Sequence, residues 1–182
     1  METSPIKDIL YHQISRMPES RILKELTSGS KKGIIAEILR KCMPEITKLE
    51  GDSYENVGVF AESLSHYLLT NAMIPSQRKV TTKNTQVDVV IPDLRTLGTA
   101  PENSLVLYFA KTSDENSILE SLVKLQNIQP RKEGIWVISK TRLKIPYKVF
   151  DVDGESSFAS LLDDIEGFLS SKPQSKFRIF KT

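Results

Sequence analysis

Two stretches of the sequence, QVDVVIPD at 86–93 and LVLYFAKT at 105–112, are rich in β-branched and aromatic residues and predict neighbouring strands. Acids are depleted from strands and costly when buried without a partner, so Asp88 indicates either a functional carboxylate or a salt bridge with Lys111. Phe109 lies two residues before Lys111 and should share its face of the strand. Asp88 and Lys111 therefore mark the candidate site.

Length and composition describe an ordinary folded chain. It has 182 residues, of which 39% are hydrophobic and 26% are charged, as expected for one domain with or without an extension. A net charge of +2 means that any attraction for a polyanion must come from local clusters. The single cysteine, Cys42, excludes a disulfide framework and a cysteine-based zinc site. Without a signal-peptide pattern or a bilayer-length apolar run, we expect a cytoplasmic protein with no membrane partner.

The elements around the two stretches alternate between helical and strand patterns. Apolar residues recur at helical spacing over 54–71, 114–128 and 157–169, and strand patterns cover 78–82, 87–91, 104–111, 134–140 and 148–152. We therefore predict an α/β fold whose core has the order αβββαβ and a mixed sheet.

The first 43 residues predict three short helices, which form an N-terminal helical extension. Lys31, Lys32, Arg40 and Lys41 on the third would suit a helix-turn-helix DNA reader, but acids balance bases over 1–50. A packing or dimerisation element is therefore favoured. We divide the chain into the helical extension (1–50), an α/β domain (51–171) and a basic tail (172–182).

The predicted order, with Glu62 on the first core helix, Asp88 on the second strand and Lys111 at the end of the third, resembles the PD-(D/E)XK restriction-endonuclease-like superfamily. The nearest likeness, over about 54–152, is to archaeal Holliday-junction resolvases. This resemblance implies that Glu62, Asp88 and Lys111 are catalytic, that Asp88 and Glu62 hold Mg²⁺ or Mn²⁺, and that the protein acts on branched or junction DNA in repair or recombination.

The sequence departs from that family at one position. The family has an acid two residues before the lysine, where this chain has Phe109, and a phenyl ring offers no oxygen ligand to magnesium. A migrated acid, Asp93 or Glu102, is an alternative, although Pro92-Asp93 favours a turn. We expect a degenerate active site with weak or lost metal-dependent phosphodiesterase activity. The alternative is an inactive protein-interaction scaffold, and a homodimer is possible.

Basic residues near the predicted site are candidates for contacts with nucleic-acid phosphates, although solvated loops would have the same composition. They are Arg78, Lys79, Lys83, Lys140, Arg142 and Lys144.

The basic tail carries a further pattern. Gln174, Phe177 and Phe180 resemble a sliding-clamp-binding box, with Phe177 in place of an aliphatic residue and Lys181 in place of a second aromatic. A disordered tail or an added edge strand is the alternative interpretation.

Overall fold

A computed structural model describes residues 4–153 and 157–172. The helices are α1 (Pro5–Ser15), α2 (Glu19–Thr27), α3 (Lys31–Ile46), α4 (Ser53–Asn71), α5 (Leu94–Thr99), α6 (Glu115–Gln126) and α7 (Leu161–Ser170). The strands are β1 (Gln77–Thr82), β2 (Thr85–Ile91), β3 (Leu105–Phe109), β4 (Ile135–Ser139) and β5 (Lys148–Asp151). Short 3-10 turns are η1 (Pro101–Asn103), η2 (Lys132–Gly134) and η3 (Ser157–Ser160). The predicted clamp-binding pattern of Gln174, Phe177 and Phe180 lies outside the described residues.

The five strands form one mixed sheet in the order in which they occur in the chain. The pairs β1–β2 and β2–β3 are antiparallel, whereas β3–β4 and β4–β5 are parallel. Lys83 and Asn84 connect β1 to β2 with φ of 46° and 59°, as two-residue hairpin turns favour. The predicted αβββαβ order of the core is confirmed, with α4 as its first helix and α6 as its second.

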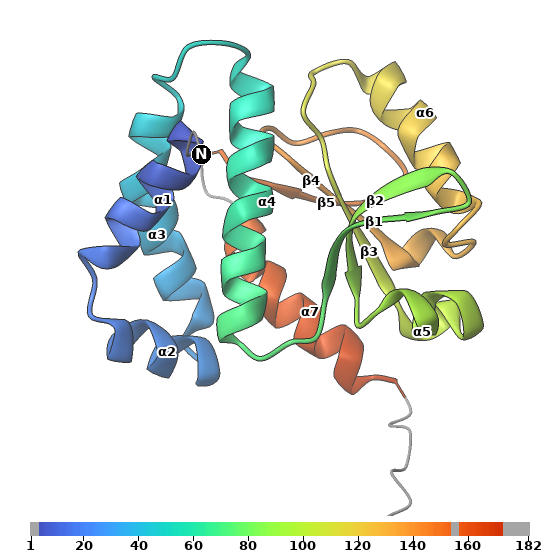
Figure 1. Ribbon diagram of the computed structural model, residues 1–182, viewed down its shortest axis with the longest axis horizontal. Coiled ribbons are helices and arrows are strands. Elements are labelled where there is room, and N and C mark those ends of the chain that lie inside the picture. The colour runs from blue at the N-terminus through green and yellow to red at the C-terminus, as the bar shows by residue number, and fades with distance from the viewer. Residues whose placement is uncertain (1–3, 154–156, 173–182) are drawn as a thin grey trace, which may run out of the picture.

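Helices cover both faces of the sheet (Figure 1). One face packs with α1, α3, α4 and α7 in a single apolar cluster that contains Leu10, Ile34, Leu64, Leu107 and Phe109. The other face packs with α5 and α6 in a second cluster. The helices of the predicted extension thus share their core with the sheet. The domain boundary at residue 50 stays a prediction.

Helix α3 is enclosed by other helices, contacting α1, α2, α4, α7 and η3. Lys31, expected on its surface, is only 7% exposed, and its Nζ lies 2.9 Å from Glu166 of α7. The Nζ of Lys41 lies 3.2 Å from Glu37 of the same helix. These contacts favour a packing role for α3 over a DNA-reading role.

Residues 93–103, between the second and third strands, fall outside the elements that the sequence predicts. They form α5 and η1, and the Asp93 side chain caps α5 by accepting from Thr96 N at 2.7 Å. Asp93 thereby satisfies a free N–H group at the start of the helix. Asp93 serves as a helix cap, whereas the sequence favoured a turn at Pro92-Asp93, and Glu102 is exposed in η1.

Among the described residues, no helix combines the length and the apolar character needed to span a bilayer.

Phe109 is a core residue, 2% exposed. We expect Phe109→Glu to lower the free energy of unfolding by at least about 3–5 kcal/mol, because the ring is lost and a carboxylate is buried without a partner. Denaturant unfolding measures this, with Val123→Glu at a 60% exposed position of α6 as the control, expected within about 0.5 kcal/mol of the parent. A stable Phe109→Glu protein would mean that the side chain at this position reaches solvent.

Candidate functional site

The candidate site lies where β2 separates from β3. Pairing of the two strands covers Val89–Ile91 and Leu105–Leu107 and does not extend to Asp88. The Asp88 carboxylate lies beside β3 instead, where its Oδ2 accepts a hydrogen bond from Phe109 N at 3.0 Å. Val87 and Val90 pack in the same cluster although residues three apart on a regular strand face opposite sides. This irregularity turns Asp88 into the gap between the strands.

Glu62 and Lys111 meet in this region. Lys111 Nζ lies 2.9 Å from Glu62 Oε2, and Arg78 Nη2 of β1 lies 3.3 Å from Glu62 Oε1. Burial alone would raise the pKa of the Glu62 carboxyl, which is 3% exposed, but the hydrogen bond and charge of Lys111, helped by Lys79 and Arg78, hold that pKa below its ordinary value. Glu62 is therefore a buried, ionised carboxylate.

Gly58, one turn before Glu62 on α4, allows this contact. A Cβ at position 58 would lie 2.7 Å from Ala110 O and 2.8 Å from the Lys111 side chain. The helix therefore touches the end of β3 directly, and Lys111 extends along α4 from Gly58 to Glu62. No sequence pattern marked Gly58 in advance, because a glycine within a helix carries no signal of what lies against it.

Asp88 has the opposite environment to Glu62. Burial raises the pKa of Asp88, and the Phe109 N–H and the charges of Lys111 and Lys79 offset this only in part. Among the described residues, Asp88 has no cation within ion-pair distance, so the predicted salt bridge with Lys111 is wrong. Lys111 pairs with Glu62 instead.

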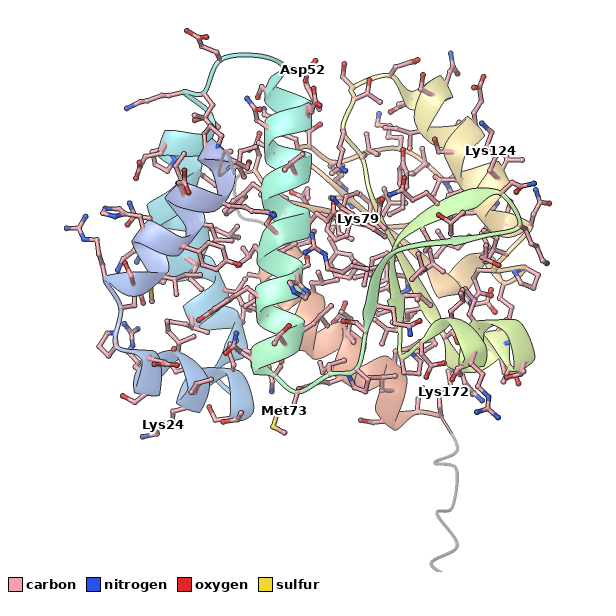
Figure 2. All side chains as sticks on the ribbon, viewed as in Figure 1. Lys24, Asp52, Met73, Lys79, Lys124 and Lys172 are labelled. Atoms are coloured by element: carbon pink, nitrogen blue, oxygen red, sulfur yellow. The ribbon has the colours of Figure 1, made fainter. Side chains whose placement is uncertain are left out.

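A hollow of about 180 Å³ adjoins Asp88 on the side of the sheet that α6 covers. Its lining residues are Thr85, Gln86, Asp88, Tyr108, Ser121, Lys124 and Leu125. Figure 2 labels Lys124 on α6. Tyr108 and Ser121 were not anticipated, because isolated polar residues on an amphipathic helix or a strand carry no motif. The contact between α6 and β2 brings Ser121 to Asp88, whereas Tyr108 lies on β3, the strand that pairs with β2.

The predicted basic residues divide into two groups. Arg78 contacts Glu62, and Lys79 is exposed beside α4, where its charge acts on both Asp88 and Glu62 (Figure 2). Lys79 has a φ of 48°, an uncommon conformation for a residue within a strand. These two residues therefore belong to the candidate site.

The other predicted basic residues lie outside it. Lys83 is at the hairpin turn, where its Nζ donates to Asn127 O at 3.1 Å. Lys140 Nζ lies 2.9 Å from Asp153 and 5.2 Å from the centre of the Tyr54 ring. Arg142 and Lys144 are exposed in the loop between β4 and β5.

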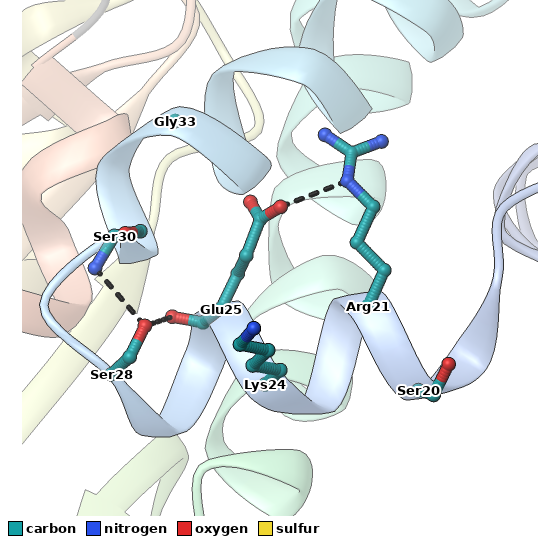
Figure 3. A pocket seen from close by; sticks show the side chains of 7 residues that line it. All are labelled: Ser20, Arg21, Lys24, Glu25, Ser28, Ser30 and Gly33. Atoms are coloured by element: carbon teal, nitrogen blue, oxygen red, sulfur yellow. Dashed lines mark hydrogen bonds and ion pairs between the residues drawn. The ribbon is translucent and has the colours of Figure 1, made fainter.

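A larger hollow, of about 610 Å³, lies between α2 and the start of α3 (Figure 3). Its lining residues are Ser20, Arg21, Lys24, Glu25, Ser28, Ser30 and Gly33. Arg21 Nε lies 2.8 Å from Glu25, so these opposite charges neutralise each other. None of the residues of the candidate site reaches this hollow.

The chain is similar in structure to the restriction endonuclease PspGI, solved in a complex with its substrate DNA. The TM-score is 0.63 at 13% sequence identity, and the alignment covers 93% of this chain and 94% of the other. The chain has the restriction-endonuclease-like fold. No protein-family model and no curated protein sequence matches it. Because the identity is low, the restriction-endonuclease-like fold is what the comparison establishes, and the likeness to Holliday-junction resolvases stays a prediction.

Restriction-endonuclease-like folds commonly use Mg²⁺. Magnesium prefers oxygen ligands in near-octahedral geometry. Both Glu62 oxygens are held by cations, and one Asp88 oxygen accepts from Phe109 N. Within residues 4–153 and 157–172, no group of three or more acidic, histidine or cysteine side chains is arranged to hold a metal. In this arrangement the residues do not fit a divalent metal.

Gly58→Ala should distort the site. Because the added Cβ would meet a backbone oxygen at 2.7 Å, we expect a loss of about 1–3 kcal/mol in the free energy of unfolding and a shift of Lys111. Denaturant unfolding measures the loss. Gly33→Ala in α3 is the matched control, since nothing lies within 4 Å of its added Cβ, and it should gain about 0.5–1 kcal/mol. Equal effects at both positions would contradict the close approach of α4 to β3.

Asp88→Asn should stabilise the protein at neutral pH. A carboxyl whose pKa is raised by folding binds its proton more tightly in the folded state, so stability falls as pH rises from the ordinary value of 3.8 through the folded-state pKa. Asparagine avoids this loss and can still accept from Phe109 N. We expect a gain on the order of 1 kcal/mol at pH 7 that disappears below pH 3.8, measured by unfolding across this range. A less stable variant at pH 7 would show that Lys111 and Lys79 outweigh burial.

Proposed function

We propose that this chain binds DNA through its restriction-endonuclease-like fold and that its metal-dependent cleavage is weak or lost. The observation that carries the proposal is the convergence of Glu62, Asp88 and Lys111 with Arg78 and Lys79 where β2 and β3 separate. Arg78, Lys79 and Lys111 lie near two carboxylates there, and the buried Glu62 carboxylate is already paired with Arg78 and Lys111. The arrangement can attract a phosphate group but offers few free oxygens to a metal.

Exposed cations support the DNA-binding part of the proposal. Lys79, Arg142 and Lys144 are exposed, and Lys111 is partly so, as contacts with backbone phosphates require. The structural neighbour is itself a DNA complex. We propose branched or junction DNA, in repair or recombination, as the substrate class, on the strength of the sequence resemblance to resolvases.

Phe109 supports the loss of cleavage. At the position where the family has its second acid, this chain has the phenyl ring of Phe109, which packs in the core. Asp88 is then the one carboxylate of the site with an oxygen that makes no hydrogen bond or ion pair within the described residues. The assignment of Glu62, Asp88 and Lys111 as catalytic, and of the first two as ligands of Mg²⁺ or Mn²⁺, stays a prediction that a cleavage assay decides.

Fluorescence anisotropy with junction, flap and duplex DNA tests the binding. We expect log K to fall linearly with log salt, and Lys79→Ala to reduce the slope by about 0.9, the value for one lost phosphate contact on duplex DNA. Lys24→Ala on α2 removes a positive charge far from the site and should leave the slope unchanged (Figure 2). No binding to any of these DNAs at low salt would refute the proposal.

A cleavage assay with Mn²⁺ on the same DNAs tests the second part. We expect little or no product. Metal-dependent cleavage that disappears in Asp88→Ala would show an active nuclease and would contradict the loss of activity.

The alternative function is an inactive scaffold that binds a protein partner or dimerises. Tyr11 on α1 and Leu23 on α2 favour it, because their side chains are 51% and 37% exposed. A chain that forms a dimer in sedimentation and binds no DNA would support this alternative. For the proposed sliding-clamp contact of the tail, deletion of 173–182 should abolish capture by the clamp.

A further inference from the structure

Glu62 lies on the inner side of the cations that it binds. It is 3% exposed, whereas the Lys111 and Arg78 side chains are 37% and 24% exposed. One carboxylate oxygen faces each cation, at 2.9 Å for Lys111 and 3.3 Å for Arg78. The charged groups of both cations are therefore turned toward Glu62, although part of the Lys111 side chain stays in contact with solvent.

Arg78 is held weakly in this position. Its contact with Glu62, at 3.3 Å, is longer than the usual 2.7–2.9 Å of a charge-assisted hydrogen bond. Its Nε is buried and, within the described part of the chain, has no hydrogen-bond partner. Leaving a buried donor unpaired is unfavourable. The inward position of Arg78 therefore depends on the negative charge of Glu62.

A carboxylate and a phosphodiester compete for the same donors. Each offers anionic oxygens to a guanidinium and an ammonium group, and Arg78 and Lys111 together supply both. Lys79, exposed and close enough to influence Glu62 and Asp88, adds a third positive charge. The site thus has the composition of a phosphate-binding site whose anion position is filled by a side chain of the same chain.

We propose that Glu62 acts as an internal competitor of the DNA phosphate, an inference that rests on the proposed function. DNA binding then requires Arg78 and Lys111 to exchange the Glu62 carboxylate for a backbone phosphate. Removing the charge at position 62 frees both cations and tightens binding. If Glu62 were instead a metal ligand or a catalytic acid, removing its charge would weaken metal-dependent DNA binding. The direction of the change in affinity therefore separates the two roles.

Glu62→Gln tests the inference, because glutamine keeps the shape and the hydrogen-bonding ability of the side chain and removes its charge. In anisotropy titrations with EDTA present, we expect roughly three- to tenfold tighter DNA binding at low salt. We also expect a salt slope about 0.9–1.8 steeper, which corresponds to one or two additional phosphate contacts. Glu62→Gln/Arg78→Gln should lose most of this gain.

Glu55→Gln is the matched control. Glu55 is an exposed acid in the first turn of the same helix, so its substitution changes the net charge by the same amount without touching Arg78 or Lys111. It should leave affinity and salt slope close to those of the parent. A gain equal to that of Glu62→Gln would show a general charge effect and would overturn the inference.

Circular dichroism and thermal unfolding establish that each variant is folded. If Glu62→Gln does not fold, Glu62→Asp replaces it: the shorter side chain draws the carboxylate back from Arg78 and should give a smaller gain in affinity. Unchanged or weaker DNA binding by a folded variant, while the parent chain binds DNA, overturns the inference and leaves the proposed function standing.

Inorganic pyrophosphate separates the two possible failures. If neither chain binds DNA but pyrophosphate raises the unfolding temperature of Glu62→Gln more than that of the parent, the competitor role holds and the proposed function fails. If neither DNA nor pyrophosphate distinguishes the variant from the parent, the inference is overturned.

Discussion

The contact between Glu62 and Lys111 is the constraint on which the candidate site depends. It joins α4 to the chain just after β3, and Gly58 makes it possible by letting the helix approach the Ala110 carbonyl. Arg78 extends the contact to β1. The buried Glu62 carboxylate therefore links α4, β1 and the end of β3. Asp88 lies beside them, in the gap between β2 and β3.

Stability alone does not explain this arrangement. Taking charges out of water costs several kcal/mol per ion, and a buried ion pair is often no better than apolar side chains of similar volume. An apolar residue at position 62 would fit its surroundings, because the neighbours of Glu62 on α4 include Phe60, Ala61 and Leu64 of the first apolar cluster. A charged group kept in such surroundings, beside an Arg78 Nε that has no partner in the described part of the chain, favours a functional origin for the cluster.

The sequence was sufficient for the αβββαβ order of the core, although not for α5 between β2 and β3, and it singled out Glu62, Asp88 and Lys111, which lie close together in the structure. Strand and helix periodicity determine which residues face the core, and the order of the elements then limits which ends can meet. The details of the site depended on tertiary contacts that no local pattern records. Phe109 does share a face with Lys111, but the packing of α4 encloses the ring in the core. Lys31 looked like a surface lysine until α7 supplied Glu166. The Glu62 partner of Lys111 likewise lies 49 residues away in the chain.

The two carboxylates of the site illustrate how position determines chemistry. Glu62, surrounded by cations, has its pKa lowered despite deeper burial, whereas Asp88, with a single backbone donor and no ion pair among the described residues, has its pKa raised. Two neighbouring acids whose pKa values are shifted in opposite directions are typical of a functional site. In this chain the cations that could have paired with Asp88 are bound by Glu62. Because Lys111 and Arg78 bind Glu62, they form no ion pair with Asp88 within the described residues, and a phosphate that removed them from Glu62 would change the charge environment of both acids at once.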